Sequence, residues 1–319
     1  MFWLQSLAVL ALPLGLCLVL SAALGRGQLL KRWTFVWLVL LGALGGLFFA
    51  LFGAETVDTW SAWVLGPSRS AQIFGQAFAE ELGKALILLV LLRTREYRSP
   101  VDGLLFGLAA GTGFAVVENI GYGAVAFGNG GAAEFWATMA GRVPASLVIH
   151  GGTTAMVGAG LAEVRWEQRR WTVLLALPAL LSVATFIHGG WNTLITQAVR
   201  SDPAAIGAVA LLFAMIFFGV VLLVYASDAE DRAILAELEA EVESGHLTAT
   251  SVMRATNKPR ANRFRWMLSR TSRRKRKHAL RLAYARRRNR ERPDLEPHVE
   301  DQQDKLDALR RELRRKDPS

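Results

Sequence analysis

Long apolar runs dominate the first two thirds of this 319-residue chain, of which 52% is hydrophobic. Each run has about 20 residues, which as α-helix reach about 30 Å, the thickness of the hydrocarbon core of a bilayer. The runs are continuous rather than alternating, and lipid offers the backbone no hydrogen-bond partners, so helices are expected rather than a β-barrel. The pattern predicts an all-α polytopic transmembrane helix bundle of about seven spans, at residues 2–24, 33–53, 71–92, 101–128, 136–162, 171–199 and 204–226.

Basic residues alternate between the connections of these spans and predict their orientation. Three connections carry nine Lys or Arg residues, and the alternate connections carry only Arg69 and Arg200. Basic connections stay on the cytoplasmic side of a membrane. We therefore expect a multi-pass protein of the cell membrane with its N-terminus outside and its C-terminal tail in the cytoplasm. The nine residues are Arg26, Lys31, Arg32, Arg93, Arg95, Arg98, Arg165, Arg169 and Arg170.

The composition changes abruptly at Ser227, which predicts two domains, a transmembrane bundle at 1–226 and a basic tail at 227–319. Residues 254–292 of the tail hold 17 Lys or Arg against one acid, Glu291. We expect this tail to be helical in part and disordered in part, and to bind anionic lipid headgroups, since each basic residue near a membrane surface contributes about 1 kcal/mol. Nucleic acid is the weaker alternative, because no nucleic-acid-binding fold is legible.

Four of the spans carry charged or imidazole side chains. Inserting a charged side chain into the membrane costs about 2.5–3.5 kcal/mol, so such residues usually mark a functional site. Counted inward from the external ends of the spans, two glutamates and two histidines lie roughly 15–20 Å deep at 1.5 Å per residue. Such a set can converge on a metal ion or an activated water. The four residues are Glu81, Glu118, His150 and His188, and they are accompanied by Glu80, Lys84 and Asn192.

Each of these residues also has a structural interpretation. Glu80 with Lys84 can form a buried ion pair that does no chemistry. Arg142 lies nearer the external face and can extend its side chain to the membrane surface. A lone histidine in a span is often a satisfied interhelical donor. The common depth of the acids and histidines favours the chemical interpretation.

Three short motifs follow one another on the polar spans: EELGK fits EExxK, FAVVE fits FxxxE and HGGWN fits HxxxN. In this order they resemble the PrsW-type intramembrane proteases, a family related to the CAAX-processing and bacteriocin-processing membrane proteases. The resemblance covers about residues 1–226. It implies cleavage of a peptide bond in a membrane-anchored protein, such as an anti-sigma factor. The matched positions are Glu80, Glu81 and Lys84, then Phe114 and Glu118, then His188 and Asn192, with His150 as the additional histidine.

Two mechanisms of peptide hydrolysis remain open from the sequence. In the first, Zn²⁺ is held by a combination of Glu81, Glu118, His150 and His188, with one acid spared as the base and Asn192 donating to the oxyanion. In the second, there is no metal, and Glu81 with the histidines activates the water directly. An HExxH helix, which would indicate zinc, is absent, and a single cysteine, Cys17, excludes a Cys-based metal site.

The expected activity is therefore that of an intramembrane endopeptidase of metallo or glutamate type, with Glu80 as a further candidate catalytic residue. Acids and histidines in spans also build proton relays, so a proton-coupled transporter is the first alternative. The sequence shows no inverted repeat, which is a pointer to many secondary transporters. A non-catalytic membrane scaffold is the second alternative, but it has no need of Glu and His on four helices.

Overall fold

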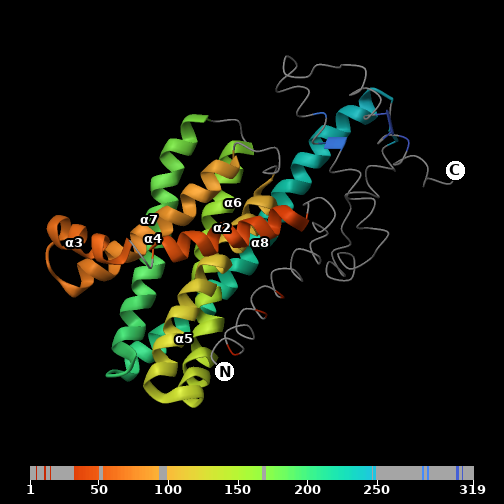
Figure 1. Ribbon diagram of the computed structural model, residues 1–319. Coiled ribbons are helices and arrows are strands. Elements are labelled where there is room, and N and C mark those ends of the chain that lie inside the picture. The colour runs from red at the N-terminus through yellow and green to blue at the C-terminus, as the bar shows by residue number, and fades with distance from the viewer. Residues whose placement is uncertain are drawn as a thin grey trace. The chain divides into compact units, whose positions relative to one another are not determined.

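The computed structural model describes residues 32–49, 53–92, 99–166, 170–245 and 247–248, with a few isolated positions elsewhere. This part of the chain contains helices and no strand, which confirms the all-helical prediction (Figure 1). The first expected span, residues 2–24, lies almost entirely outside the described residues. The helices are α2 (Arg32–Phe48), α3 (Ala54–Leu65), α4 (Arg69–Leu92), α5 (Pro100–Ser146), the π-helical turn η3 (Leu147–Gly151), α6 (Gly152–Trp166), α7 (Arg170–Ala198) and α8 (Asp202–Glu243).

Three of the described helical stretches are long and apolar enough to cross a membrane: Pro100–Val164, Leu174–Ala198 and Asp202–Glu243. A shorter apolar helix runs over Val36–Phe48. The helix α4 is continuous and its 24 residues suffice to span a bilayer. Its apolar sequence is interrupted by Glu80, Glu81 and Lys84, which lower its mean hydropathy. These helices are those of a membrane protein, and the count of seven spans remains a prediction.

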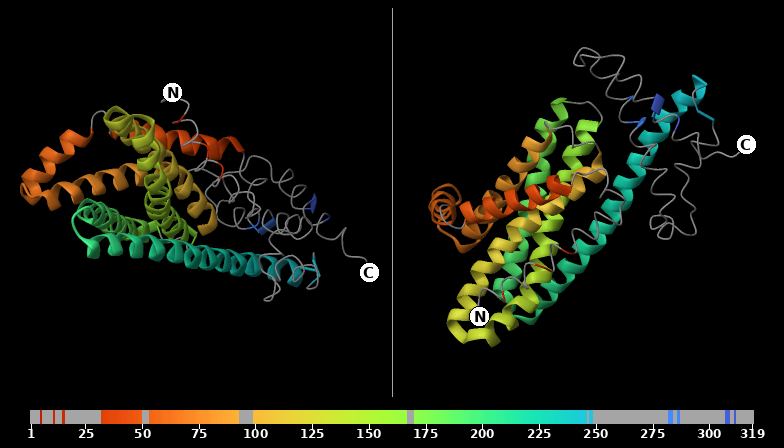
Figure 2. Two further views of the ribbon diagram at one scale, coloured as in Figure 1. Left: turned by 90° about the horizontal axis from the view of Figure 1, so that it is seen from below. Right: turned by 45° about the vertical axis from the view of Figure 1, so that its right-hand side comes forward.

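The stretch Pro100–Val164 is not straight, because α5 reverses its direction at two glycines. Gly130 has φ −146° and ψ 16°, and Gly131 has φ 68°, a left-handed conformation that favours glycine. Two antiparallel limbs result, and the turn between them is visible at the end of α5 in Figures 1 and 2. The reversal falls between the two spans expected at residues 101–128 and 136–162.

The first limb of α5 forms the centre of the bundle and packs against both α2 and α6. Glycines four residues apart permit this close approach. A methyl group at Gly107 would lie 2.1 Å from the carbonyl oxygen of Thr154, and one at Gly111 would lie 2.2 Å from that of His150. Small residues allow helix backbones to approach in this way in membrane bundles. The contact fixes the position of the backbone that carries His150.

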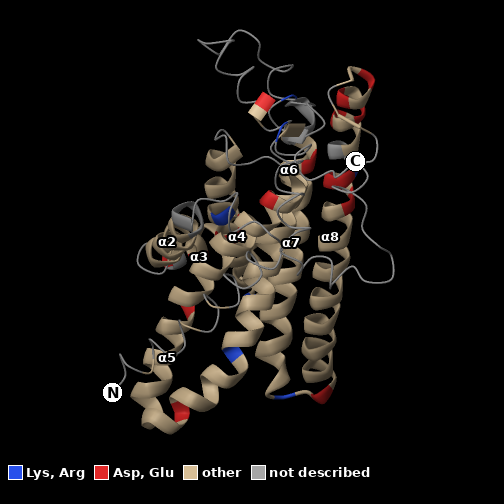
Figure 3. Cartoon of the chain, turned by 90° about the vertical axis from the view of Figure 1, so that its right-hand side faces the viewer, with Lys and Arg blue, Asp and Glu red and all other residues tan. Residues whose placement is uncertain are grey.

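Two further helices were not expected in the form observed. The short helix α3 fills part of what the apolar pattern predicts as a connection, and packs against the start of α4, where Gln76 donates a hydrogen bond of 2.8 Å to Asp58. The helix α8 continues without interruption past the expected span into the acidic segment (Figure 3). Up to Ala226 its residues belong to one compact unit together with α2–α7, and from Ser227 they belong to a second.

Candidate active site

The helix α4 contributes three charged side chains that are all buried: Glu80, Glu81 and Lys84. The Lys84 ammonium lies 2.5 Å from Oε1 of Glu81, so the lysine pairs with the glutamate three residues away. The ammonium also lies 3.1 Å from Nδ1 of His150 and 4.9 Å from the centre of the Phe114 ring. The interpretation of Glu80 and Lys84 as an inert ion pair is therefore wrong, because the partner of Lys84 is Glu81.

Glu81 is held through one of its two oxygens. Besides pairing with Lys84, Oε1 accepts a hydrogen bond of 3.2 Å from the hydroxyl of Thr153 and lies 3.0 Å from Nδ1 of His188. A carboxylate accepts hydrogen bonds, so Nδ1 of His188 carries the proton and Nε2 presents its lone pair. This arrangement, a carboxylate that orients one imidazole nitrogen and leaves the other for a ligand, is the usual surrounding of metal-binding histidines.

His150 lies in the π-helical turn η3, between α5 and α6. Single π-turns of this kind often occur at functional sites, because the extra residue redirects the side chains that follow. The ring stacks on Phe114 with 5.4 Å between centres, and Nε2 lies 2.8 Å from Oε2 of Glu118. An ammonium only donates, so Nδ1 accepts from Lys84, and the proton of the ring lies on Nε2, toward Glu118.

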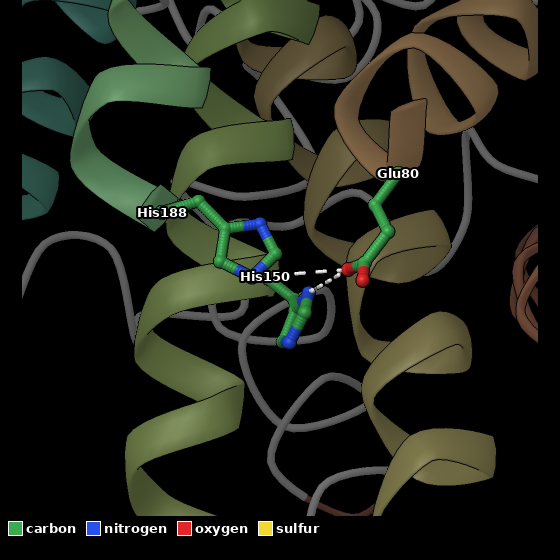
Figure 4. Close-up of side chains that lie close together, drawn as sticks. All are labelled: Glu80, His150 and His188. Carbon is green, nitrogen blue, oxygen red and sulfur yellow. Dashed lines mark ion pairs between the residues drawn. The ribbon is translucent and has the colours of Figure 1, made fainter. Parts of the chain in front are cut away.

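Glu80 points toward both imidazoles from the neighbouring helix, and the two rings contact each other edge to face with 4.6 Å between centres (Figure 4). Its Oε2 lies 3.7 Å from Nε2 of His188 and 4.0 Å from Nδ1 of His150, which is too far for a hydrogen bond. This oxygen is buried and has no hydrogen-bond partner among the residues that the structure describes. Nδ1 of His150 already accepts from Lys84, so the acceptor atoms that face one another are Oε2 of Glu80 and Nε2 of His188, and a buried pair of this kind is unfavourable unless a water or a cation is placed between them.

The donor set of this group fits a zinc ion. One donor atom from each of Glu80, His150 and His188 lies within 4.8 Å of the others, and all three residues are buried. Two imidazole nitrogens and one carboxylate oxygen are ligands that Zn²⁺ prefers, and catalytic zinc sites commonly have three protein ligands. Two donors on one tetrahedral zinc lie roughly 3.3 Å apart, given bonds of about 2.0–2.1 Å. The three donor atoms lie within 4.8 Å of one another, so a bound ion would require them to move closer and the Lys84 ammonium to leave Nδ1 of His150.

The remaining predicted residues lie around this group at different distances. Glu118 contacts His150 but uses its second oxygen to pair with Arg142 at 3.1 Å. Arg142 is thus engaged by Glu118, and both side chains are about a quarter exposed, at 27% and 24%. Asn192 is half-buried on α7, one turn beyond His188 on the same helix face.

Besides Asn119, which accompanies Glu118 on the fourth expected span, the site contains Thr153 and Tyr122, which were not singled out from the sequence. Thr153 contacts Glu81, and Asn119 connects Arg142 to Ser146 through hydrogen bonds of 3.3 and 2.7 Å. Tyr122 places its ring 3.4 Å from the Arg142 guanidinium carbon. The signal for Tyr122 is its helical spacing, since it follows Glu118 by four residues and so lies on the same face of α5.

Comparison with known proteins agrees with this geometry. Residues 31–224 match the family model described as PrsW family intramembrane metalloprotease. No curated protein and no solved structure matches the chain significantly. The matched residues contain every side chain of the site, and they cover more than half of the chain. The chain belongs to the PrsW family of intramembrane metalloproteases.

Proposed function

We propose that this protein is an endopeptidase that hydrolyses a peptide bond of a membrane-anchored protein at the group formed by Glu80, His150 and His188. The observation that carries the proposal is the buried Oε2 of Glu80, which lacks a hydrogen-bond partner among the described residues and lies 3.7 Å from Nε2 of His188 and 4.0 Å from Nδ1 of His150. A water placed there would donate its protons to electron-rich atoms. Such a water is the nucleophile that peptide hydrolysis requires.

In a glutamate-type mechanism, Glu80 acts as the general base. Its unpartnered oxygen takes the proton of the attacking water and holds it for delivery to the leaving amine. Nε2 of His188 orients the same water by accepting a hydrogen bond from its second proton. Lys84 and Glu81 stay paired and keep the two rings in place.

In a metallo-type mechanism, Glu80, His150 and His188 would hold a Zn²⁺ ion, which when bound would supply a water of lowered pKa and a Lewis acid for the substrate carbonyl. Glu81 orients His188 through Nδ1, as outer carboxylates do in zinc sites. The second oxygen of Glu81 is buried without a hydrogen-bond partner among the described residues and takes the proton of the nucleophile. Relative to the set expected from sequence, Glu80 replaces Glu81 and Glu118 as the acidic ligand.

Asn192 is the candidate donor to the oxyanion. Its side chain lies on the same face of α7 as His188, and no charged group is needed for this role, because an amide N–H placed near the developing charge is worth about 10²–10³ in rate. The half-buried position of Asn192 leaves room for a substrate backbone to approach it.

We further propose that the N-terminus lies outside and the tail in the cytoplasm, where the basic segment binds anionic lipid headgroups. The alternation of basic connections and the charge of residues 254–292 support this orientation. The substrate class follows from the family, and a membrane-anchored regulator such as an anti-sigma factor is the expected kind. Labelling of a cysteine introduced at Glu134 by an impermeant reagent added outside intact cells tests the orientation, and protection from that reagent would contradict it.

The test of the proposed activity compares new protein termini in the membrane fraction of cells that produce either the native chain or Glu80→Gln. We expect the native chain to generate new termini within or beside apolar segments of other proteins. The variant removes one carboxylate while keeping the size of the side chain, so those termini should disappear. Glu134→Gln is the matched control, since Glu134 is an exposed acid on α5 far along the helix from Glu118.

Identical sets of termini from the native chain and Glu80→Gln would contradict the proposal. A proton flux through reconstituted vesicles that depends on Glu80, without any change in termini, would instead support the transporter alternative.

A further inference from the structure

Arg142 forms a bridge between the two limbs of α5 that the motifs of the active site do not include. Its Nη2 lies 3.1 Å from Oε1 of Glu118, and its Nε donates to Oδ1 of Asn119 at 3.3 Å. The guanidinium carbon lies 3.4 Å from the centre of the Tyr122 ring. One side chain on the second limb thus contacts three residues on the first limb, through two donors and its flat face.

Asn119, which accepts a hydrogen bond from Arg142, is held in place by further hydrogen bonds. Asn119 donates its side-chain N–H to the hydroxyl of Ser146 at 2.7 Å, and that hydroxyl donates to the carbonyl oxygen of Val143 at 3.2 Å. Asn119 and Ser146 are both buried. Because a guanidinium is planar and presents its donors in fixed directions, these contacts determine where Glu118 can lie.

Glu118 transmits this position to His150. One of its oxygens faces Arg142 and the other lies 2.8 Å from Nε2 of His150. The carboxylate thus lies against Nε2 of His150 and favours the ring proton on that nitrogen, while Nδ1 accepts from Lys84. Without the guanidinium, Glu118 would be a partly exposed acid with a single weak restraint and no balancing charge.

We propose that Arg142 is a positioning residue of this enzyme, which holds Glu118 so that His150 keeps the orientation and the protonated nitrogen that the site requires. The proposal rests on the proposed function for its consequence in catalysis, but the orientation itself can be measured without any substrate. Loss of an outer partner of a metal-binding histidine typically lowers metal affinity or activity 10- to 100-fold.

The first test is the ¹⁵N spectrum of the histidine rings, in the metal-free full chain in lipid nanodiscs. The chain has five histidines, and the signals of His150 are identified by their absence in His150→Gln. In the native chain we expect His150 to show a protonated Nε2 and an unprotonated Nδ1. In Arg142→Gln we expect the Nε2 signal to shift and broaden, and in Arg142→Lys an intermediate change.

The second test is the affinity for Zn²⁺, measured by competition with a chromophoric chelator. We expect Arg142→Gln to weaken it about 10- to 100-fold. Arg200→Gln, which removes an arginine at the α7–α8 turn, is the matched control and should leave both measurements unchanged. If Arg142→Gln does not fold, Tyr122→Leu removes the ring beneath the guanidinium and should cause a smaller change in the same direction.

An unchanged His150 spectrum in a folded Arg142→Gln or Tyr122→Leu chain would overturn the inference. A native chain that does not bind Zn²⁺ would count against the metallo-type mechanism alone, because the ring spectrum reports on Arg142 in the absence of metal.

Discussion

The helices α4 and α8 place their side chains in opposite ways. In α4, the charged side chains of Glu81 and Lys84 are each only 1% exposed. In the part of α8 that precedes Ala226, the large apolar side chains face outward, with Phe213 68% and Phe217 71% exposed. This inverts the usual distribution of a water-soluble protein and is expected in lipid, where apolar side chains are already well solvated and polar groups must find partners inside. The comparison shows that α4 turns its charged groups into the bundle, whereas α8 turns large apolar side chains outward.

The largest effect should follow from removing the unpartnered acid of α4. Glu80→Gln should lower the rate of cleavage by about 10²- to 10⁴-fold, since the oxygen that faces both imidazoles is lost as a base or as a ligand. The measurement is the cleavage rate of a membrane-anchored substrate by reconstituted protein, with circular dichroism as the check on folding. Substantial activity in a folded Glu80→Gln chain would contradict the catalytic role proposed for Glu80 on α4.

Replacement of the neighbouring acid should have a smaller effect. Glu81→Gln weakens the contacts that hold His188 and Lys84, so we expect a loss of at least 10-fold in the same assay. The size of the loss separates the two mechanisms. A loss as large as that of Glu80→Gln favours Glu81 as the base beside a metal ion, and a loss confined to about 10- to 100-fold favours Glu80 as the base. Full activity would contradict both.

A pair of glycine substitutions tests whether the backbone around the site is as tightly placed as the contacts indicate. Gly111→Ala should lower the stability of the bundle by about 1–3 kcal/mol, because the added methyl group would lie 2.2 Å from the carbonyl oxygen of His150. Gly83→Ala, on the exposed face of α4 between Glu81 and Lys84, meets no atom within 4 Å and should be neutral or stabilising by about 0.5–1 kcal/mol. Thermal unfolding in detergent measures both, and equal midpoints would contradict the close α5–α6 contact.

The smallest effect is expected on α8. Phe217→Leu exchanges one lipid-facing apolar side chain for another, so both stability and cleavage should change little, with stability within about 0.5 kcal/mol. Phe217→Lys places a charge on the same face and should cost about 2.5–3.5 kcal/mol if that face meets lipid. Insertion efficiency and thermal unfolding measure the difference. Equal behaviour of the two variants would mean that this face of α8 is not in the membrane.

The sequence predicted the helical class and named the candidate residues of the site. It did not predict which of these side chains contact one another. Apolar runs of the length of a bilayer are decided by composition, so α2, α4 and α7 lie close to their expected ranges. The choice between Glu80 and Glu81 as the partner of Lys84 was not decided by spacing, because the two glutamates lie four and three residues from the lysine and both spacings allow a contact.

Other features depend on tertiary contacts that no local pattern reports. The π-helical turn at His150 arises where α5 and α6 meet, and nothing in the run LVIHG distinguishes it from an ordinary helical turn. The contacts of Arg142 form because Glu118, Asn119 and Tyr122 lie opposite it on the first limb of α5. The reversal at Gly130 and Gly131 brings the two limbs next to each other. The role of each candidate residue in catalysis remains a prediction.

The most direct test of the central claim, that Glu80, His150 and His188 form one reactive centre, is the zinc content per chain of purified protein, measured beside its cleavage activity in excess chelator. The metallo-type mechanism predicts about one Zn²⁺ per native chain, less in Glu80→Gln, and activity that chelator removes and added zinc restores. The glutamate-type mechanism predicts activity that survives chelator yet still disappears in Glu80→Gln. Activity that survives both chelator and Glu80→Gln would contradict the claim in either form.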